Sequence, residues 1–300
     1  MQLTIIIPII RFNHYSTIMM KNLARMEEKY ESLIFLFAVS DEKVATELKI
    51  LLGDFVNEYT ISVLNSYSSN TLRGYAKYAN TDYVYFHDCD DYADYTYLND
   101  FCRNMSASED VLCFNVHKYE YNEEGDIVKE YDIFHNRDGK IDCICNIPTC
   151  VYSKIIPIKY IKEIDFPNLP YTQDWSITYQ LFLLAPHRFI NHSSYFYNNY
   201  PTSSSQSRYD TVHRVTRVMS YGRTIIRKMK RNGRLFEADF LCARYNDAVF
   251  DRFLRIGVLI NPYVPSLRLL LSATNRVRLS LLYNFFKKIA SAVKYILKKR

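Results

Sequence analysis

The sequence predicts an α/β sandwich with a mostly parallel central sheet, followed by a C-terminal helical region. Short apolar runs bounded by polar turns alternate with amphipathic stretches over about the first 90 residues. That alternation is typical of a parallel sheet covered by helices. With 48% hydrophobic residues in 300 positions, the chain can bury a full core. Its seven glycines include no phosphate-binding loop and no dinucleotide fingerprint.

The individual elements follow from the spacing of apolar residues. Runs of strand length predict buried strands at Leu3–Ile9, Leu33–Val39, Thr60–Leu64, Tyr83–His87 and Val111–Val116. Apolar spacing near 3.6 residues predicts helices at 14–29, 42–52, 69–79, 174–184, 210–231 and 235–256. Between 118 and 173 the pattern is irregular, so we expect loops and short strands there. Ligands of such sheets bind beyond the carboxyl ends of the strands.

Cysteine usage and the N-terminus bear on the compartment. The seven cysteines form no regular framework, which favours free thiols in a reducing compartment, and no His or Cys pair completes a zinc site with Cys143, Cys145 and Cys150. The opening MQLTIIIPII has no basic region and too short an apolar run for a signal peptide. We therefore expect a cytoplasmic protein.

Three carboxylates follow the strand Tyr83–His87 within four positions: Asp88, Asp90 and Asp91. Clustered carboxylates repel one another, and hard oxygen ligands select Mg²⁺ or Mn²⁺, which also bind phosphate oxygens. The alternative is an acidic surface turn that caps a helix near Asp94. Because the strand is expected to be central, we favour a diphosphate-binding metal site.

These motifs resemble a family 2 glycosyltransferase of the GT-A (Rossmann-like) fold. The family's opening strand is similar to Ile6-Ile7-Pro8-Ile9-Ile10-Arg11-Phe12-Asn13 of this chain, and its second strand is similar to Phe37-Ala38-Val39-Ser40-Asp41. The family's Asp-x-Asp signature is similar to Asp88-Cys89-Asp90. Only Ala79-Asn-Thr-Asp-Tyr83 matches the helix and turn that precede the signature. The resemblance spans residues 3–200.

The resemblance implies a nucleotide-sugar donor, with UDP expected. It places Pro8 and Phe12 in donor binding, Asp41 on the uracil edge, Asp88 at the ribose and metal, and Asp90 on the metal. Asp41 is equally well explained as a helix N-cap. Arg73 stands one position out of register; it could reach the diphosphate, but a solvent-facing helix arginine is the favoured interpretation.

The acceptor side resembles the family at Tyr171-Thr172-Gln173-Asp174-Trp175, where Gln replaces the usual Glu. The resemblance makes Asp174 the general base of a single inverting displacement. The alternative is that Asp174 only stabilises the helix, because an acidic residue in a first helical turn interacts favourably with the helix dipole. Trp175 is a candidate sugar-stacking wall or a core aromatic. His192 is a candidate third metal ligand or a structural histidine.

The resemblance also implies the domain organisation. We expect a catalytic domain at 1–205, with a nucleotide-sugar half at 1–117 and an acceptor half at 118–205, and a helical region at 206–300. Residues 252–300 hold 11 of the 38 Lys and Arg and none of the 32 acidic residues. Nucleic acid is not expected as a partner, because no binding motif accompanies this charge.

From about residue 275, the apolar residues fall on one helical stripe flanked by lysines. The stripe consists of Val277, Leu281, Phe285, Ile289, Val293 and Ile296. Such a helix can lie flat on an anionic membrane, which suits a peripheral enzyme at the inner face that uses a saccharide or lipid-linked acceptor in bacterial surface polysaccharide synthesis. The alternatives are packing on the catalytic domain or on a second copy in a homodimer.

Two rival functions remain open. A haloacid-dehalogenase-type phosphatase also has a strand that ends in Asp-x-Asp. Its motif, however, lies close to the chain start and has a Thr or Val two positions after the second Asp, where this sequence has Tyr92. A catalytically degenerate membrane-surface scaffold is the non-enzymatic alternative, on account of the departures at Leu72, Arg73 and Gln173.

Overall fold

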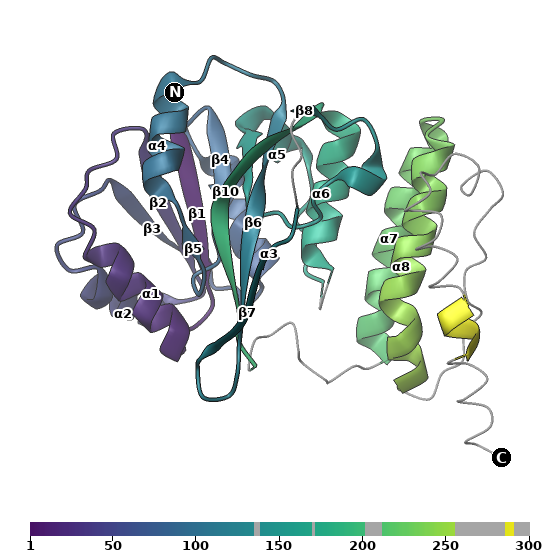
Figure 1. Cartoon of the computed structure of the whole chain (residues 1–300), viewed down its shortest axis with the longest axis horizontal. Helices are drawn as coiled ribbons and strands as arrows, with labels where there is room; N and C mark the ends of the chain where they lie inside the picture. Colours follow the sequence, from purple (N-terminus) through teal and green to yellow (C-terminus); the bar gives the residue numbers. More distant parts are fainter. Residues whose placement is uncertain (135–138, 170–171, 202–211, 256–285, 291–300) are drawn as a thin grey trace. The chain divides into compact units, whose positions relative to one another are not determined.

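The computed structural model describes residues 1–134, 139–169, 172–201, 212–255 and 286–290 (Figure 1). The chain divides into two compact units. The first comprises Met1–Asn168 and Gln173–Gln206, and the second Leu169–Thr172 and Ser207–Arg300. The functional division expected at residue 205 stays a prediction, since residues 202–211 lie outside the described part.

The first half of the sheet is parallel. Strands β1 (Leu3–Ile9), β2 (Leu33–Val39), β3 (Tyr59–Val63) and β4 (Tyr83–Phe86) lie in the order β3-β2-β1-β4. They are connected by α1 (His14–Ala24), α2 (Glu42–Leu52), α3 (Ser69–Arg73) and the 3₁₀ turn η1 (Gly74–Tyr78). The expected strand-helix alternation of this half is confirmed.

Both faces of this half-sheet are buried, which explains its nearly continuous apolar strands. Ile5 and Phe35 belong to a core cluster with residues of α1, α2 and α4 (Tyr95–Asn104). On the opposite face Ile6 and Phe86 are equally buried, and the Phe86 ring lies 6.0 Å from that of Phe166. The layered sandwich therefore follows from burial of alternate residues on either side.

Beyond β4 the sheet is mixed, so the expected fold class is confirmed with a sheet that is not strictly parallel. Strand β9 (Lys154–Pro157) is antiparallel to both β4 and β6 (Val111–Tyr121), whereas β10 (His187–Asn199) is parallel to β6. The short strand β5 (Tyr92–Ala93) pairs antiparallel with β10. A buried short strand inserted between β4 and β6 reverses the direction without a helical crossover.

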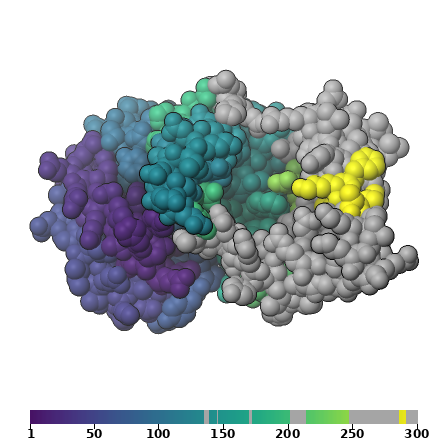
Figure 2. Space-filling model, turned by 60° about the horizontal axis from the view of Figure 1, so that its bottom comes forward, coloured from purple at the N-terminus to yellow at the C-terminus, as the bar shows by residue number. Residues whose placement is uncertain are grey.

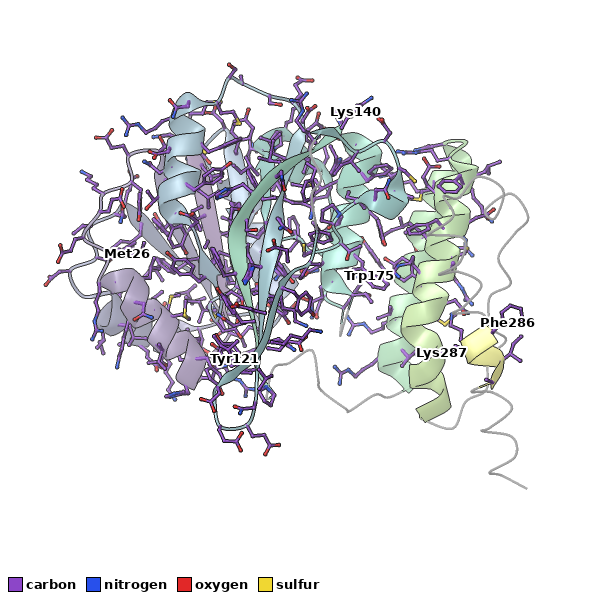
Figure 3. The ribbon with its side chains drawn as sticks, in the orientation of Figure 1. Met26, Tyr121, Lys140, Trp175, Phe286 and Lys287 are labelled. Carbon is purple, nitrogen blue, oxygen red and sulfur yellow. The ribbon has the colours of Figure 1, made fainter. Side chains whose placement is uncertain are left out.

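The irregular region from 118 to 173 contains more structure than expected. Strand β6 runs on to Tyr121 and forms a hairpin with β7 (Ile127–Asp132), which stands at the front of the first unit beside α1 in Figure 2. Tyr121, labelled in Figure 3, stacks on Tyr200, which stacks on Tyr15 of α1. The remaining elements are β8 (Gly139–Lys140), η2 (Ile144–Asn146), α5 (Ile158–Glu163) and α6 (Gln173–Leu184).

The second unit contains two long helices, α7 (Val212–Arg231) and α8 (Leu235–Arg255), joined at Gly233, whose φ of +72° suits a glycine. They approach closely at Gly222, where an added Cβ would lie 2.7 Å from the ring of Tyr245. Both helices match the expected ranges within two residues. None of the described helices is long and apolar enough to cross a membrane.

Most of the expected amphipathic helix lies outside the described residues. Its described turn, 286–290, is helical and carries Phe286 and Lys287 (Figure 3). There Ile289 of the apolar stripe is 38% exposed, whereas Lys288 is buried and donates to Asn246 Oδ1 at 3.4 Å. The membrane contact therefore stays a prediction.

Candidate active site

The acidic run begins where β4 ends and turns directly into β5. Asp91 is fully buried and accepts two hydrogen bonds from β10, one from the Tyr195 hydroxyl (2.5 Å) and one from the Asn198 amide (2.8 Å). Burial, together with the charges of Asp90 and Asp88, raises the pKa of Asp91 well above its usual range. Asp91 thus fastens the turn to the sheet and leaves the other two carboxylates at the surface of the site.

Asp90 is a half-buried carboxylate of the same turn. Burial and the neighbouring charge of Asp88 raise its pKa to about 6, and Arg73 opposes this shift only weakly as the last of its causes. Asn198 Nδ2 donates to the backbone carbonyl of Asp90 at 3.0 Å, which fixes the turn. An added cation would relieve the cost of keeping this carboxylate ionised.

Arg73 joins the two halves of the site. From the end of α3, its Nη2 lies 2.6 Å from Asp88 Oδ1 and its Nη1 lies 2.8 Å from Asp174 Oδ1. Its side chain is 5% exposed. Burial alone would lower its pKa, but the two carboxylates raise it above the ordinary value, so the guanidinium is always charged.

The expectation of a solvent-facing Arg73 was therefore wrong. The helix α3 is only five residues long and ends at Arg73, so the side chain leaves its last turn toward the carboxyl ends of the strands. Asn70 of the same turn holds it in place by accepting a hydrogen bond from Nη1 at 3.3 Å, while its own amide donates to the Pro167 carbonyl.

Asp174, the expected general base, lies in the first turn of α6 and is brought to Asp88 by the shared arginine. Burial raises its pKa; Arg73 opposes this, and the nearby charge of Asp88 adds to it. Its Oδ1 is engaged by Arg73, and no hydrogen bond to Oδ2 occurs within the part of the chain that the structure describes. The second oxygen is thus available to accept a proton.

Asp41 lies at the end of β2 and caps α2, as one of its two interpretations predicts. Its Oδ1 accepts from the Val44 amide at 3.0 Å, and its Oδ2 accepts from the Tyr67 hydroxyl at 3.0 Å. The Val44 amide is the largest cause of a lowered Asp41 pKa. The role of Asp41 at a uracil edge stays a prediction.

The two remaining donor-side residues belong to β1 and the segment after it. Pro8 is buried within β1 opposite Ala38 of β2. Phe12 is half-buried and packs against the core ahead of the Asn13 cap of α1. Their proximity to a nucleotide stays a prediction.

His192 does not meet the acidic pair. It lies at the bulge of β10 against α4, where its ring stacks on Tyr97 at 3.5 Å and its Nε2 is 3.7 Å from Asp94 Oδ2. The expectation of a third metal ligand is corrected accordingly, because the ring packs on a helix. Trp175 (Figure 3) follows Asp174 on α6, half-buried, with its ring 6.5 Å from that of Tyr179; its contact with an acceptor stays a prediction.

The carboxylate oxygens of the site are hard ligands of the kind that divalent cations such as Mg²⁺ bind. Asp88 and Asp90 offer carboxylate oxygens, and a bound cation would favour the ionised form of Asp90 against the effects of burial and of the Asp88 charge. Across the described ranges, no group of three or more His, Cys, Asp and Glu side chains is arranged to hold a metal. Binding of Mg²⁺ or Mn²⁺ at Asp88 and Asp90 therefore stays a prediction.

Sequence reasoning missed the residues of β10 that support the site, Tyr195 and Asn198. Besides its bond to Asp91, the Tyr195 hydroxyl accepts from the Asp88 amide at 3.1 Å. These residues lie 104 and 107 positions from Asp91 in a stretch without a periodic pattern. No signal within a single sequence relates such distant positions.

Comparison with known proteins defines the fold. No protein-family model and no curated protein matches the sequence. Crystal structures of S. aureus TarS residues 1–349 match with 16% identity over 98% of this chain and 90% of theirs, with TM-scores of 0.64 for the complex with UDP-GlcNAc and 0.60 for that with UDP. A longer TarS structure matches over 97% of this chain and 54% of its own, with a TM-score of 0.57.

The likeness also decides between two of the expected architectures. In the phosphatase alternative the acidic signature lies near the chain start, whereas here it follows the fourth strand of a sheet shared with TarS. The expected fold resemblance is confirmed, with the correction that the sheet is mixed. The chain therefore has a GT-A-like glycosyltransferase fold.

Proposed function

We propose that this chain is a metal-dependent, inverting glycosyltransferase that moves a hexosyl or N-acetylhexosaminyl group from a UDP-sugar to an acceptor hydroxyl. One observation carries the proposal: Arg73 holds Asp88, at the end of β4, and Asp174, at the start of α6, against a single guanidinium. The S. aureus TarS structures of similar fold contain UDP-GlcNAc and UDP, which supports a uridine donor.

In this proposal Asp174 is the general base. Its raised pKa makes the carboxylate a better proton acceptor at neutral pH. As Oδ2 takes the acceptor's proton, the hydroxyl oxygen bonds to the anomeric carbon, and the bond between that carbon and the diphosphate breaks on the opposite face. One displacement of this kind inverts the anomeric configuration.

Asp88 and Asp90 would hold Mg²⁺ or Mn²⁺. The ion would supply positive charge to the departing diphosphate. Arg73 is a positioning residue in this account, since both terminal nitrogens are engaged by carboxylates. It fixes Oδ1 of Asp88 and of Asp174 and leaves the second oxygen of each for ligands.

We propose that the base of the donor lies across the ends of β1 and β2 and is bound by Pro8, Phe12 and Asp41, and that Trp175 contacts the acceptor. A saccharide or lipid-linked acceptor of bacterial surface polysaccharide synthesis would suit a cytoplasmic enzyme held at the inner membrane face by its basic residues at 275–300. The absence of acidic residues after Asp251 supports this attachment to an anionic surface.

Donor hydrolysis tests the proposal. The protein is incubated with Mn²⁺ and a panel of nucleotide sugars, and release of free sugar is measured. We expect slow hydrolysis of a UDP-sugar that falls at least tenfold in Asp90→Ala and in Asp174→Asn. Asp54→Ala, an exposed acid after α2, is the matched control and should retain full turnover.

The same experiment separates the alternatives. Absence of turnover together with absence of UDP binding would favour the degenerate scaffold. Phosphate release from simple esters would revive the phosphatase. Equal hydrolysis by the wild-type protein and Asp90→Ala would contradict the assignment of the metal site.

A further inference from the structure

Tyr67 is an exposed aromatic residue that the loop after β3 places beside Asp41. Its side chain is 72% exposed, and its hydroxyl donates to Asp41 Oδ2 at 3.0 Å. The loop is attached to the end of β2 by the Ser66 amide, which donates to the Ser40 carbonyl at 3.1 Å. Asn65 allows this path by adopting the left-handed φ of +47° that asparagine tolerates. The backbone of this loop therefore holds the Tyr67 hydroxyl beside Asp41.

The two oxygens of Asp41 are engaged differently. Oδ1 accepts a hydrogen bond from the Val44 amide, and this bond is the N-cap of α2. It is therefore part of the folded helix. Oδ2 accepts from Tyr67. Ser40 Oγ also lies 3.0 Å from Oδ2, but its single proton has the Ile10 carbonyl at 2.7 Å as a closer acceptor. Tyr67 is thus the principal donor to Oδ2.

We propose that Tyr67 competes with the nucleobase for Oδ2 of Asp41, and so sets the affinity for the uridine nucleotide. The inference rests on the proposed function, in which a uracil N–H is bound by Asp41. A carboxylate oxygen has two lone pairs, and the Ser40 and Tyr67 hydroxyl oxygens each lie 3.0 Å from Oδ2, so a base N–H needs one of these groups to move away. Since the Tyr67 ring is mostly exposed, it loses little packing when it turns away. The nucleotide therefore binds the fraction of molecules in which the Tyr67 hydroxyl has turned away from Oδ2.

Removing the phenol hydroxyl tests the competition. Tyr67→Phe keeps the ring and leaves Oδ2 to the solvent, so UDP should bind about three- to fivefold more tightly in calorimetric titration with Mn²⁺ present, the gain expected for one exposed hydrogen bond. Tyr78→Phe is the matched control. Tyr78 is also 72% exposed, and within the described ranges its hydroxyl makes no hydrogen bond. Its affinity for UDP should equal that of the wild-type protein.

A second variant shows whether the effect passes through Asp41. Asp41→Ser retains a residue that caps helices well but removes Oδ2. If the competition is real, Tyr67→Phe should change UDP affinity in the native background and leave it unchanged in Asp41→Ser. A gain that persists without Oδ2 would overturn the inference.

The outcomes separate this inference from the function on which it rests. If wild-type protein binds UDP, and Tyr67→Phe binds it equally or more weakly, the inference is overturned and the proposed function stands. If wild-type protein fails to bind UDP with Mn²⁺ present, the proposed function is overturned and the inference with it.

Discussion

Replacing Arg73 with methionine tests the geometry of the site through protein stability. The guanidinium is 5% exposed and serves two carboxylates, which are 28% and 26% exposed. Methionine fills a similar volume but leaves Asp88 and Asp174 without their cation, so two like charges then face each other across the vacated position. The variant should unfold more readily, and the pKa of Asp174, which Arg73 lowers, should rise.

The magnitude follows from burial. Removing one partner from a fully buried ion pair costs about 3–5 kcal/mol. Here each carboxylate keeps about a quarter of its surface in water, so solvent and a small side-chain movement recover part of that cost. We therefore expect a loss of about 2–3 kcal/mol. Arg73→Lys keeps the charge but lacks the fork that reaches both carboxylates, and it should lose about 1–2 kcal/mol.

The assay is urea unfolding followed by tryptophan fluorescence. The chain has one tryptophan, Trp175, and it is adjacent to Asp174, so the signal reports on α6 at the site itself. Arg103→Met, an exposed arginine on α4, is the control and should change stability by less than about 0.5 kcal/mol. A change for Arg73→Met as small as that of the control would refute the bridging arrangement.

Three further predictions concern separate parts of the molecule. Tyr195→Phe should cost about 1–3 kcal/mol in urea unfolding, because the buried Asp91 carboxylate loses its hydroxyl donor; an unchanged midpoint would contradict this role. Gly222→Ala should destabilise the second unit by about 1–3 kcal/mol in thermal unfolding, because the added methyl group meets the Tyr245 ring, and a neutral effect would show that α7 and α8 are not in that contact. Since burial raises the pKa of Asp90 to about 6, Mn²⁺ affinity should fall roughly tenfold per pH unit below that value, and pH-independent affinity from 5 to 7 would exclude Asp90 as a ligand.

Local sequence patterns predict the parallel half of the fold well. The bounds of β1, β2 and α2 match the expected ranges because each is a dense apolar run or an amphipathic stretch that starts at a strong cap such as Asp41. Strand β10 was not expected. Its residues 187–199 are mostly polar or half-buried, and its pairing with β6 contains register shifts, so no clean alternation exists to detect.

The site residues that belong to short sequence motifs were predicted, whereas those that only the folded chain brings to the site were missed. Asp88 and Asp174 were expected from the resemblance, and the structure brings them to one arginine. The orientation of Arg73 could not be foreseen, because the apolar spacing of 69–79 suggested one long helix, whereas α3 ends at Arg73 and gives way to a 3₁₀ turn. Its bond to Asp174 spans 101 positions, which only the assembled sheet makes short.

A crystal structure of the protein grown with Mn²⁺ and UDP would test the central claim most directly, because manganese can be located by its anomalous scattering. We expect one manganese peak about 2.1 Å from an Asp90 carboxylate oxygen and from an oxygen of the diphosphate, with Asp88 beside it. Bound UDP without manganese at Asp88 and Asp90, or manganese bound away from both carboxylates, would contradict the account.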